Sequence, residues 1–221
     1  MANPEYLLCD ADALIQVFLT RQVQLLVALR TKYGVKAAIV PEVESEVRFN
    51  QRYKNQYENS LLKQLSSGNV TVLDTDRSRH LLRDRELPEG EIPGFVERVR
   101  GRGLEYNKYV HEGEAYSHAV ATLLQLPLLS NDREALEALE HAGLPVSLPV
   151  LRFFDLIAFG VSESIITAED GQRARSLLMG AKHEFLSYPF KEKKASFSEC
   201  LSKFSARLHA WRKSGTPPHP R

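Results

Sequence analysis

Short runs of β-type residues that alternate with longer helical stretches are the feature of this sequence that most limits its fold. The runs of strand length lie at residues 6–10 (YLLCD), 36–40 (KAAIV), 69–74 (NVTVLD), 126–130 (LPLLS) and 144–148 (LPVSL). Helical patterns follow the first two runs at 13–32 and 41–65, and another lies at 132–141. This alternation predicts an α/β domain with a central, mainly parallel sheet and right-handed crossovers.

The sequence past Pro149 has a different character, because we find no further strand pattern there. Helical segments are predicted at 150–160, 167–180 and 195–213, and the last residues, SGTPPHPR, have the composition of a disordered tail. We therefore predict a domain at residues 1–150, a C-terminal helical extension at 151–213 and a disordered tail at 214–221. Pro93 and Gly94 are predicted to lie in a loop between two helices.

Composition limits the class of protein. The 221 residues are 43% hydrophobic and 26% charged, which is typical of a soluble globular chain. No stretch approaches 18 uninterrupted apolar residues, and the first residues lack a basic segment followed by a long apolar one, so we expect a cytoplasmic protein without a membrane segment. Cys9 and Cys200 have neither CxxC nor Cys/His spacing, which argues against a disulfide framework or a zinc site.

Acidic residues stand where a parallel sheet binds its ligands, just beyond the carboxyl ends of the strands. Asp10 ends the first apolar run, and Asp132 comes just after the run LPLLS. Glu114 follows Gly113 in the first turn of a predicted helix. A carboxylate in a first turn also interacts favourably with the helix dipole, so each acid alone has a structural explanation. Their shared position relative to the sheet is what suggests a site.

The segment VPEVESEV offers three further glutamates. With Pro41 at the first helical position, Glu42 and Glu46 lie one turn apart on one face, and Glu44 points elsewhere. We favour Glu46 as the residue that reaches the sheet edge, and Glu42 remains the alternative.

These four motifs, in this order, resemble the PIN domain, and particularly the VapC-like toxin ribonucleases of bacterial toxin-antitoxin pairs. The similar segments are LLCDADALI, VPEVESEV, HEGEAYSHAVA and LLSNDREAL, within about residues 5–150. The resemblance implies a PIN-like three-layer α/β/α fold. It also implies an acidic quartet that is both catalytic and metal-binding, with Ser130 beside its last member. The quartet comprises Asp10, Glu46, Glu114 and Asp132.

Four carboxylates in one cleft raise one another's pKa values unless divalent cations neutralise them. Oxygen ligands select Mg²⁺ or Mn²⁺, which can bind a phosphodiester and activate a water molecule. This chemistry predicts phosphodiester hydrolysis, and the resemblance implies that the protein is an endoribonuclease that cleaves RNA. Asp12 is a further ligand or a helix cap. His118 lies one turn after Glu114 and is a site residue or a packed core histidine.

Basic residues near the acids suggest contacts with a nucleic-acid backbone, although charged helix faces are also ordinary solvated surface. Arg48 and Arg52 lie on the acid-bearing helix, and Arg100, Arg102 and Lys108 lie in ERVRGRGLEYNKY. The predicted partners are RNA, an antitoxin protein and a second copy of the chain.

Two alternatives come from other classes. LLCDADAL also fits the opening motif of haloacid dehalogenase-type phosphatases, with Asp10 as nucleophile and Asp12 as acid. That fold needs a late acidic pair, which the sequence after LLSND lacks, and it leaves Glu114 without a role. The second alternative is a catalytically silent PIN-like module that binds nucleic acid or serves as a scaffold.

Overall fold

The computed structural model describes residues 6–49, 57–73, 91–105, 110–124, 126–131 and 150–180. Its strands form one five-stranded, all-parallel sheet with the order β3-β2-β1-β4-β5. The strands are β1 (Tyr6–Cys9), β2 (Lys36–Ile39), β3 (Val70–Val72), β4 (Leu128–Leu129) and β5 (Val150–Leu151). The prediction of an α/β domain with a mainly parallel sheet is thus confirmed.

Strand β1 lies in the centre of the sheet. Leu8 is in register with Ala38 of β2 on one side and with Leu128 of β4 on the other. All three residues are buried. A central strand of a parallel sheet is covered on both faces, which explains why these strands are continuous apolar runs without alternation.

Eight helices lie within the described residues. They are α1 (Ala11–Leu19), α2 (Val23–Tyr33), α3 (Pro41–Phe49), α4 (Glu58–Ser66), α6 (Glu91–Glu105), α7 (Glu112–Leu124), α9 (Phe153–Ser162) and α10 (Ala168–Gly180). Because α1, α3 and α9 each follow a strand within two residues, their N-termini lie at the carboxyl edge of the sheet. Helix α7 precedes β4, so it too has its N-terminus at that edge.

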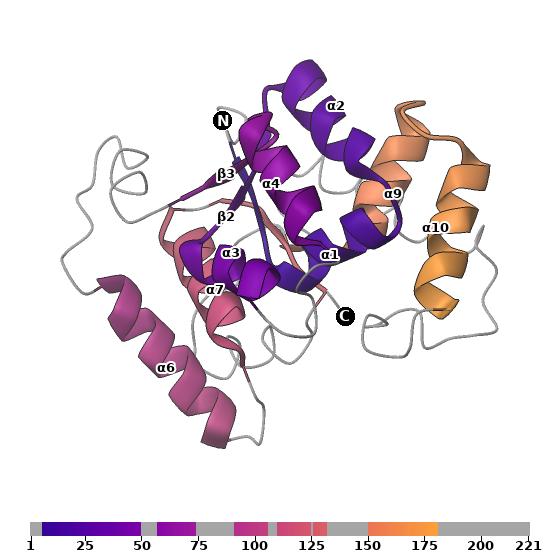
Figure 1. Cartoon of the computed structure of the whole chain (residues 1–221). Coiled ribbons are helices and arrows are strands. Elements are labelled where there is room, and N and C mark those ends of the chain that lie inside the picture. Colours follow the sequence, from indigo (N-terminus) through magenta and orange to yellow (C-terminus); the bar gives the residue numbers. More distant parts are fainter. Residues whose placement is uncertain are drawn as a thin grey trace.

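Helix contacts link both halves of the chain. Helix α9 contacts α1 and α2, and α10 contacts α1 and α9. Helix α7 contacts β1, β4, α3 and α6. Figure 1 shows α9 and α10 at one side of the molecule and α6 at the opposite side, beyond α7. One apolar core includes Leu14 of α1, Ile39 of β2, Leu129 of β4 and Phe153 of α9.

The single helix predicted at 13–32 is two helices, which are bent by 107° relative to one another. Arg21 between them adopts a left-handed φ of 59°, and the Thr20 hydroxyl donates a hydrogen bond to the carbonyl of Gln16 at 2.6 Å. The break contains neither Gly nor Pro, so apolar periodicity alone does not show it. Within the described residues, no helix taken singly has the length and apolar character to cross a membrane, and only the bent pair α1 and α2 passes that test together.

The expectation that strands end before residue 150 is wrong. Val150 and Leu151 form β5 and pair with β4, and the helix predicted at 150–160 begins at Phe153. A strand of two residues has no periodicity that distinguishes it from the start of an apolar helix. Strand β5 straddles the predicted domain boundary, and α9 belongs to the same core as the sheet. Residues 132–141, 144–148, 195–213 and 214–221 lie outside the described residues.

The loop predicted at Pro93 and Gly94 is also wrong, because both residues lie in the first turn of α6. A proline is tolerated there, since its missing N–H would have no partner within the helix.

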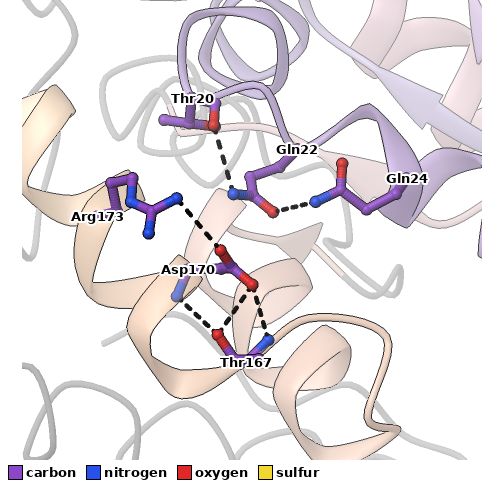
Figure 2. Close-up of polar contacts among 6 residues, drawn as sticks. All are labelled: Thr20, Gln22, Gln24, Thr167, Asp170 and Arg173. Carbon is purple, nitrogen blue, oxygen red and sulfur yellow. Dashed lines mark hydrogen bonds and ion pairs between the residues drawn. The ribbon is translucent and has the colours of Figure 1, made fainter.

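Helix α10 begins with a reciprocal pair of hydrogen bonds, drawn in Figure 2. The Asp170 backbone N–H donates to Thr167 Oγ1 at 3.1 Å, and the Thr167 backbone N–H donates to Asp170 Oδ2 at 3.1 Å. The Thr167 hydroxyl also donates to Asp170 Oδ2 at 2.9 Å. The two bonds that Thr167 donates to the carboxylate lower the pKa of Asp170, and Arg173 adds a smaller effect. Figure 2 also shows Gln22, which donates to the Thr20 carbonyl at the break between α1 and α2. The predicted helix at 167–180 is confirmed, with Thr167 as its cap.

Candidate functional site

The strand order reverses between β1 and β4, which is the position where an open α/β sheet is expected to form a crevice for a ligand. The chain passes from β1 to β2 and β3 in one direction and returns to β4 on the other side of β1, so the winding reverses between these two strands. Ligands of open α/β sheets bind at such a reversal, outside the carboxyl ends of the strands. Asp10 directly follows β1, and Ser130 directly follows β4. The Asp10 backbone N–H donates to the carbonyl of Leu129 at 3.0 Å, which fixes Asp10 beside the end of β4.

Asp10 is fully buried and is the N-cap of α1. Its Oδ1 accepts a hydrogen bond from the backbone N–H of Ala13 at 2.7 Å. This bond orients the carboxylate at the N-terminus of the helix, where the dipole favours negative charge. Capping therefore explains an acid at this position, and it also holds the acid at the crevice.

Glu114, like Asp10, both caps the N-terminus of a helix and lies at the carboxyl edge of the sheet. It lies in the first turn of α7, is 6% exposed, and its Oε2 accepts a hydrogen bond from the backbone N–H of His111 at 3.0 Å. A glutamate at the third helical position that reaches back to the cap residue is half of a capping box. The carboxylate is thus fixed at the carboxyl edge of the sheet, because the N-terminus of α7 lies there.

Glu46 of α3 lies close to Gly113 in the first turn of α7. A Cβ atom placed on Gly113 would be 2.9 Å from Glu46 Oε2 and 3.2 Å from Val43 Cγ2, so only glycine fits this contact without a shift. Burial raises the pKa of Glu46, the Asp12 carboxylate raises it further, and His111 lowers it. Glu46 therefore lies near the first turns of both α1 and α7.

The charged residues that affect Glu42 differ from those that affect Glu46. Burial raises its pKa, and the Glu112 carboxylate, not Asp12, is the acid that raises it further. Glu44 points away from both and forms an ion pair with Arg48 at 3.0 Å. Of the two glutamates, only Glu46 has an acid of α1, Asp12, among the charges that shift its pKa, so it is the better candidate for a site shared with α1.

A cleft of about 620 Å³ lies between α3, α6 and the start of α7. One face of α3 forms a wall with Glu42, Ser45, Glu46 and Phe49. Arg100 contributes from α6, and His111, Glu112 and Gly113 contribute from the start of α7. Because Glu46 is part of this wall, the cleft borders the region where α1, α3 and α7 meet.

Asn131 was not predicted as a site residue, yet it joins three elements at the crevice. Its Nδ2 donates to Gln16 Oε1 of α1 at 2.8 Å, and its Oδ1 accepts a hydrogen bond from the backbone N–H of Phe153 at 3.0 Å. The Ser130 N–H donates to the carbonyl of Leu151 at 3.0 Å. These bonds fix the end of β4, from which the chain continues to Asp132. The only sequence signal for Asn131 is its place next to a strand end.

The remaining predicted residues have different surroundings. His118 is 1% exposed within α7, and Arg100 lines the cleft. Arg48 lies in a local network, since it contacts Glu44 and its Nε is 3.8 Å from Glu58 Oε1. Arg52, Lys108 and Asp132 lie outside the described residues, and of the Arg102 side chain nothing is described.

The described residues include no group of three or more His, Cys, Asp or Glu side chains arranged to hold a metal ion. Because Asp132 is outside them, the predicted quartet stays a prediction. The chemistry of the other three predicted ligands fits a hard cation, since Asp10, Glu46 and Glu114 offer only carboxylate oxygens. Burial is the largest cause of the raised pKa of Glu46, and the nearby Asp12 carboxylate adds to it.

Comparison with known proteins gives no family for this chain: no family model, no curated protein and no solved structure matches it significantly.

Proposed function

We propose that this chain is a metal-dependent ribonuclease with a PIN-like three-layer arrangement, which hydrolyses phosphodiester bonds of RNA. The observation that carries the proposal is the position of Asp10 beside the end of β4, at the reversal of strand order, with Glu114 and Glu46 on helices that meet at the same edge. The carboxylates of Asp10 and Glu114 are buried, and each accepts a hydrogen bond from a backbone N–H group.

The proposed ligands are Asp10, Glu46, Glu114 and Asp132, with Asp12 as an additional carboxylate near Glu46. Bound Mg²⁺ or Mn²⁺ supplies charge for the phosphate and lowers the pKa of a water molecule. The N-termini of α1, α3 and α7 lie at the same edge and favour negative charge, whether it belongs to carboxylates or to a phosphodiester. Arg100 lines the same cleft as Glu46, which supports a role for it in binding a phosphate next to the one that is cleaved.

A second candidate function is the catalytically silent binding module. The specific observation in its favour is that capping explains both Asp10 and Glu114 without any metal. The two functions differ in one respect that can be measured. A silent module binds RNA without metal-dependent cleavage, whereas the proposed nuclease cleaves it.

The test is incubation of the purified chain with a fluorescent RNA in Mg²⁺, in Mn²⁺ and in EDTA. We expect cleavage in either metal and none in EDTA. Asp10→Asn and Glu114→Gln should each abolish cleavage. Asp170→Asn is the matched control, because Asp170 also caps a helix but lies on α10. The Asp170→Asn variant should cleave RNA as fast as the wild type.

Each other class gives a distinct result in the same experiment. Hydrolysis of p-nitrophenyl phosphate without RNA cleavage would indicate a phosphatase instead. RNA binding without cleavage in either metal would favour the silent module. Equal cleavage by the Asp10→Asn variant would place the active site elsewhere. A cytoplasmic location, an antitoxin partner and a homodimer stay predictions, and the last is tested by measuring the mass in solution.

A further inference from the structure

We infer that the cleft between α3, α6 and α7 binds an unpaired stretch of the substrate strand, with Phe49 as a stacking platform and Glu42 as an acceptor for base amino groups. The inference rests on the proposed function, because it places the scissile phosphate near Glu46. It adds a preference for single strands and for bases that carry an exocyclic amino group.

The wall of the cleft is a continuous stripe on α3. Glu42, Ser45, Glu46 and Phe49 recur at steps of three, one and three residues, which is one face of a helix. Glu42 and Phe49 are two turns apart, or about 10 Å along the helix axis. Glu46, the proposed ligand, lies between them. A strand that runs along this stripe with its scissile phosphate at Glu46 would therefore have flanking nucleotides on either side.

Phe49 is unusually exposed to solvent for an aromatic side chain. It is 59% exposed, more than any other large hydrophobic side chain described, and it lines the cleft. The Arg48 guanidinium lies 5.0 Å from the centre of its ring and covers one face. An aromatic ring in a cleft, supported by an arginine on one face, is a suitable platform for an unpaired base, because every base has a π face.

Glu42 supplies the polar feature of the cleft. Its Oε2 is buried and makes no hydrogen bond to any part of the chain that the structure describes. A buried acceptor without a donor costs free energy. Because Glu42 lines the cleft, rotation of its side chain would turn this oxygen toward an N–H group of a ligand and remove that cost. Carboxylates accept hydrogen bonds from exocyclic amino groups such as N4 of cytosine. Uracil has no exocyclic amino group, and its single ring N–H lies between two carbonyl oxygens that a carboxylate repels.

Arg100 and His111 provide donors on the other side of the cleft. Arg100 is exposed on α6 and forms no ion pair with the described residues, so its guanidinium is available to a phosphate. The volume of about 620 Å³ lies in the range of small-ligand pockets, which suits one or two nucleotides. Bases within a duplex are stacked on one another and cannot stack on Phe49.

The experiment measures binding separately from cleavage. An Asp10→Asn background prevents cleavage, and fluorescence anisotropy with labelled decamers of A, C and U in Mg²⁺ reports affinity. We expect oligo(C) and oligo(A) to bind more tightly than oligo(U), and a duplex of the same length to bind weakly. Phe49→Leu should weaken single-strand binding about tenfold, and Phe49→Trp should restore it. Glu42→Gln, which offers a donor as well as an acceptor, should remove the preference over oligo(U).

The control is Arg98→Gln, because Arg98 is an exposed arginine on the same helix as Arg100 but does not line the cleft. Arg100→Gln should weaken binding, whereas Arg98→Gln should not. If the wild type cleaves RNA but the Phe49 and Glu42 variants bind all decamers like the parent, the subsite is wrong and the proposed function stands. If the wild type neither binds nor cleaves RNA in either metal, the proposed function and this inference both fail. Equal affinity for single strand and duplex also overturns the subsite.

Discussion

Gly113 allows α7 to approach α3 so closely that the Glu46 carboxylate lies beside its Cα. Gly113→Ala is therefore a test of Glu46 that leaves every carboxylate in place. The new methyl group would be 2.9 Å from Glu46 Oε2, and ordinary contact begins at 3.4 Å, so the carboxylate must move by about 0.5 Å. Metal–ligand distances tolerate roughly 0.2 Å. We expect metal-dependent cleavage to fall about tenfold to a hundredfold, as when the support of a metal ligand is lost.

The free energy of unfolding should change much less than the activity. Alanine is favoured over glycine within a helix by roughly 0.5–1 kcal/mol. The close contact with Val43 Cγ2 at 3.2 Å opposes this gain, and the Glu46 side chain is free to rotate away from the new methyl. The two effects have similar size, so the melting temperature should stay within about 4 °C of the wild type.

The assay is RNA cleavage as a function of Mg²⁺ concentration, together with a thermal melt of the same sample. Gly101→Ala is the control, because it makes the same substitution within α6 and no atom lies within 4 Å of the new methyl. It should keep wild-type cleavage. A Gly113→Ala variant with wild-type rate and wild-type Mg²⁺ dependence would refute the reasoning that Glu46 is a ligand.

Three other predictions concern stability and reactivity. Glu46→Gln should raise the melting temperature at neutral pH, because burial and Asp12 raise the pKa of Glu46 and so disfavour its ionised form. This advantage should shrink as the pH falls and Glu46 takes up a proton, and a melt series from pH 8 to 4 measures it. Gly160→Ala should destabilise the fold by roughly 1–3 kcal/mol, since its Cβ would lie 2.3 Å from Leu25 Cδ2 in the core, and urea unfolding checks this. Burial strongly raises the pKa of the Cys9 thiol. In a Cys200→Ser background, we therefore expect iodoacetamide to modify the chain only after denaturation.

Opposite results would contradict each physical reason. Equal melting temperatures of Glu46→Gln and wild type across the pH series would show that the surroundings do not disfavour the ionised form of Glu46. An unchanged urea midpoint for Gly160→Ala would show that α9 does not pack closely on α2. Rapid alkylation of native Cys9 would show that β1 opens often.

The sequence predicted those parts of the fold that depend on apolar runs and on residues that end them, such as glycine and proline. Strand 70–72 consists of β-branched residues after the turn at Gly68, and strand 36–39 lies between Gly34 and Pro41, so their positions follow from pattern alone. The break at Arg21 and the two-residue strand β5 do not, because both depend on tertiary contacts. Arg21 adopts a left-handed conformation without glycine, and β5 exists only through its pairing with β4.

The candidate site also contains residues that the sequence predicts and residues that it does not. Asp10 and Glu114 are predictable because a strand end and a first turn are positions that the sequence marks directly. The choice between Glu42 and Glu46 needed the contact with Gly113, which brings together two helices that are far apart in the chain. Asn131 and Phe49 escaped prediction for the same reason. Their roles come from neighbours that are remote in sequence, such as Gln16 for Asn131.

The central position of β1 also has a consequence for the time at which this protein becomes complete during synthesis. Leu8 pairs with Leu128, so the first strand must wait for 120 further residues before it acquires its second neighbour. Pairing between such distant segments closes a long loop and forms late in folding. The ribosome adds roughly 5–20 residues per second, so Asp10 remains without the β4 side of its crevice for about 6–24 seconds after it is made. A nascent chain should therefore acquire its candidate site only when more than half of it has been translated.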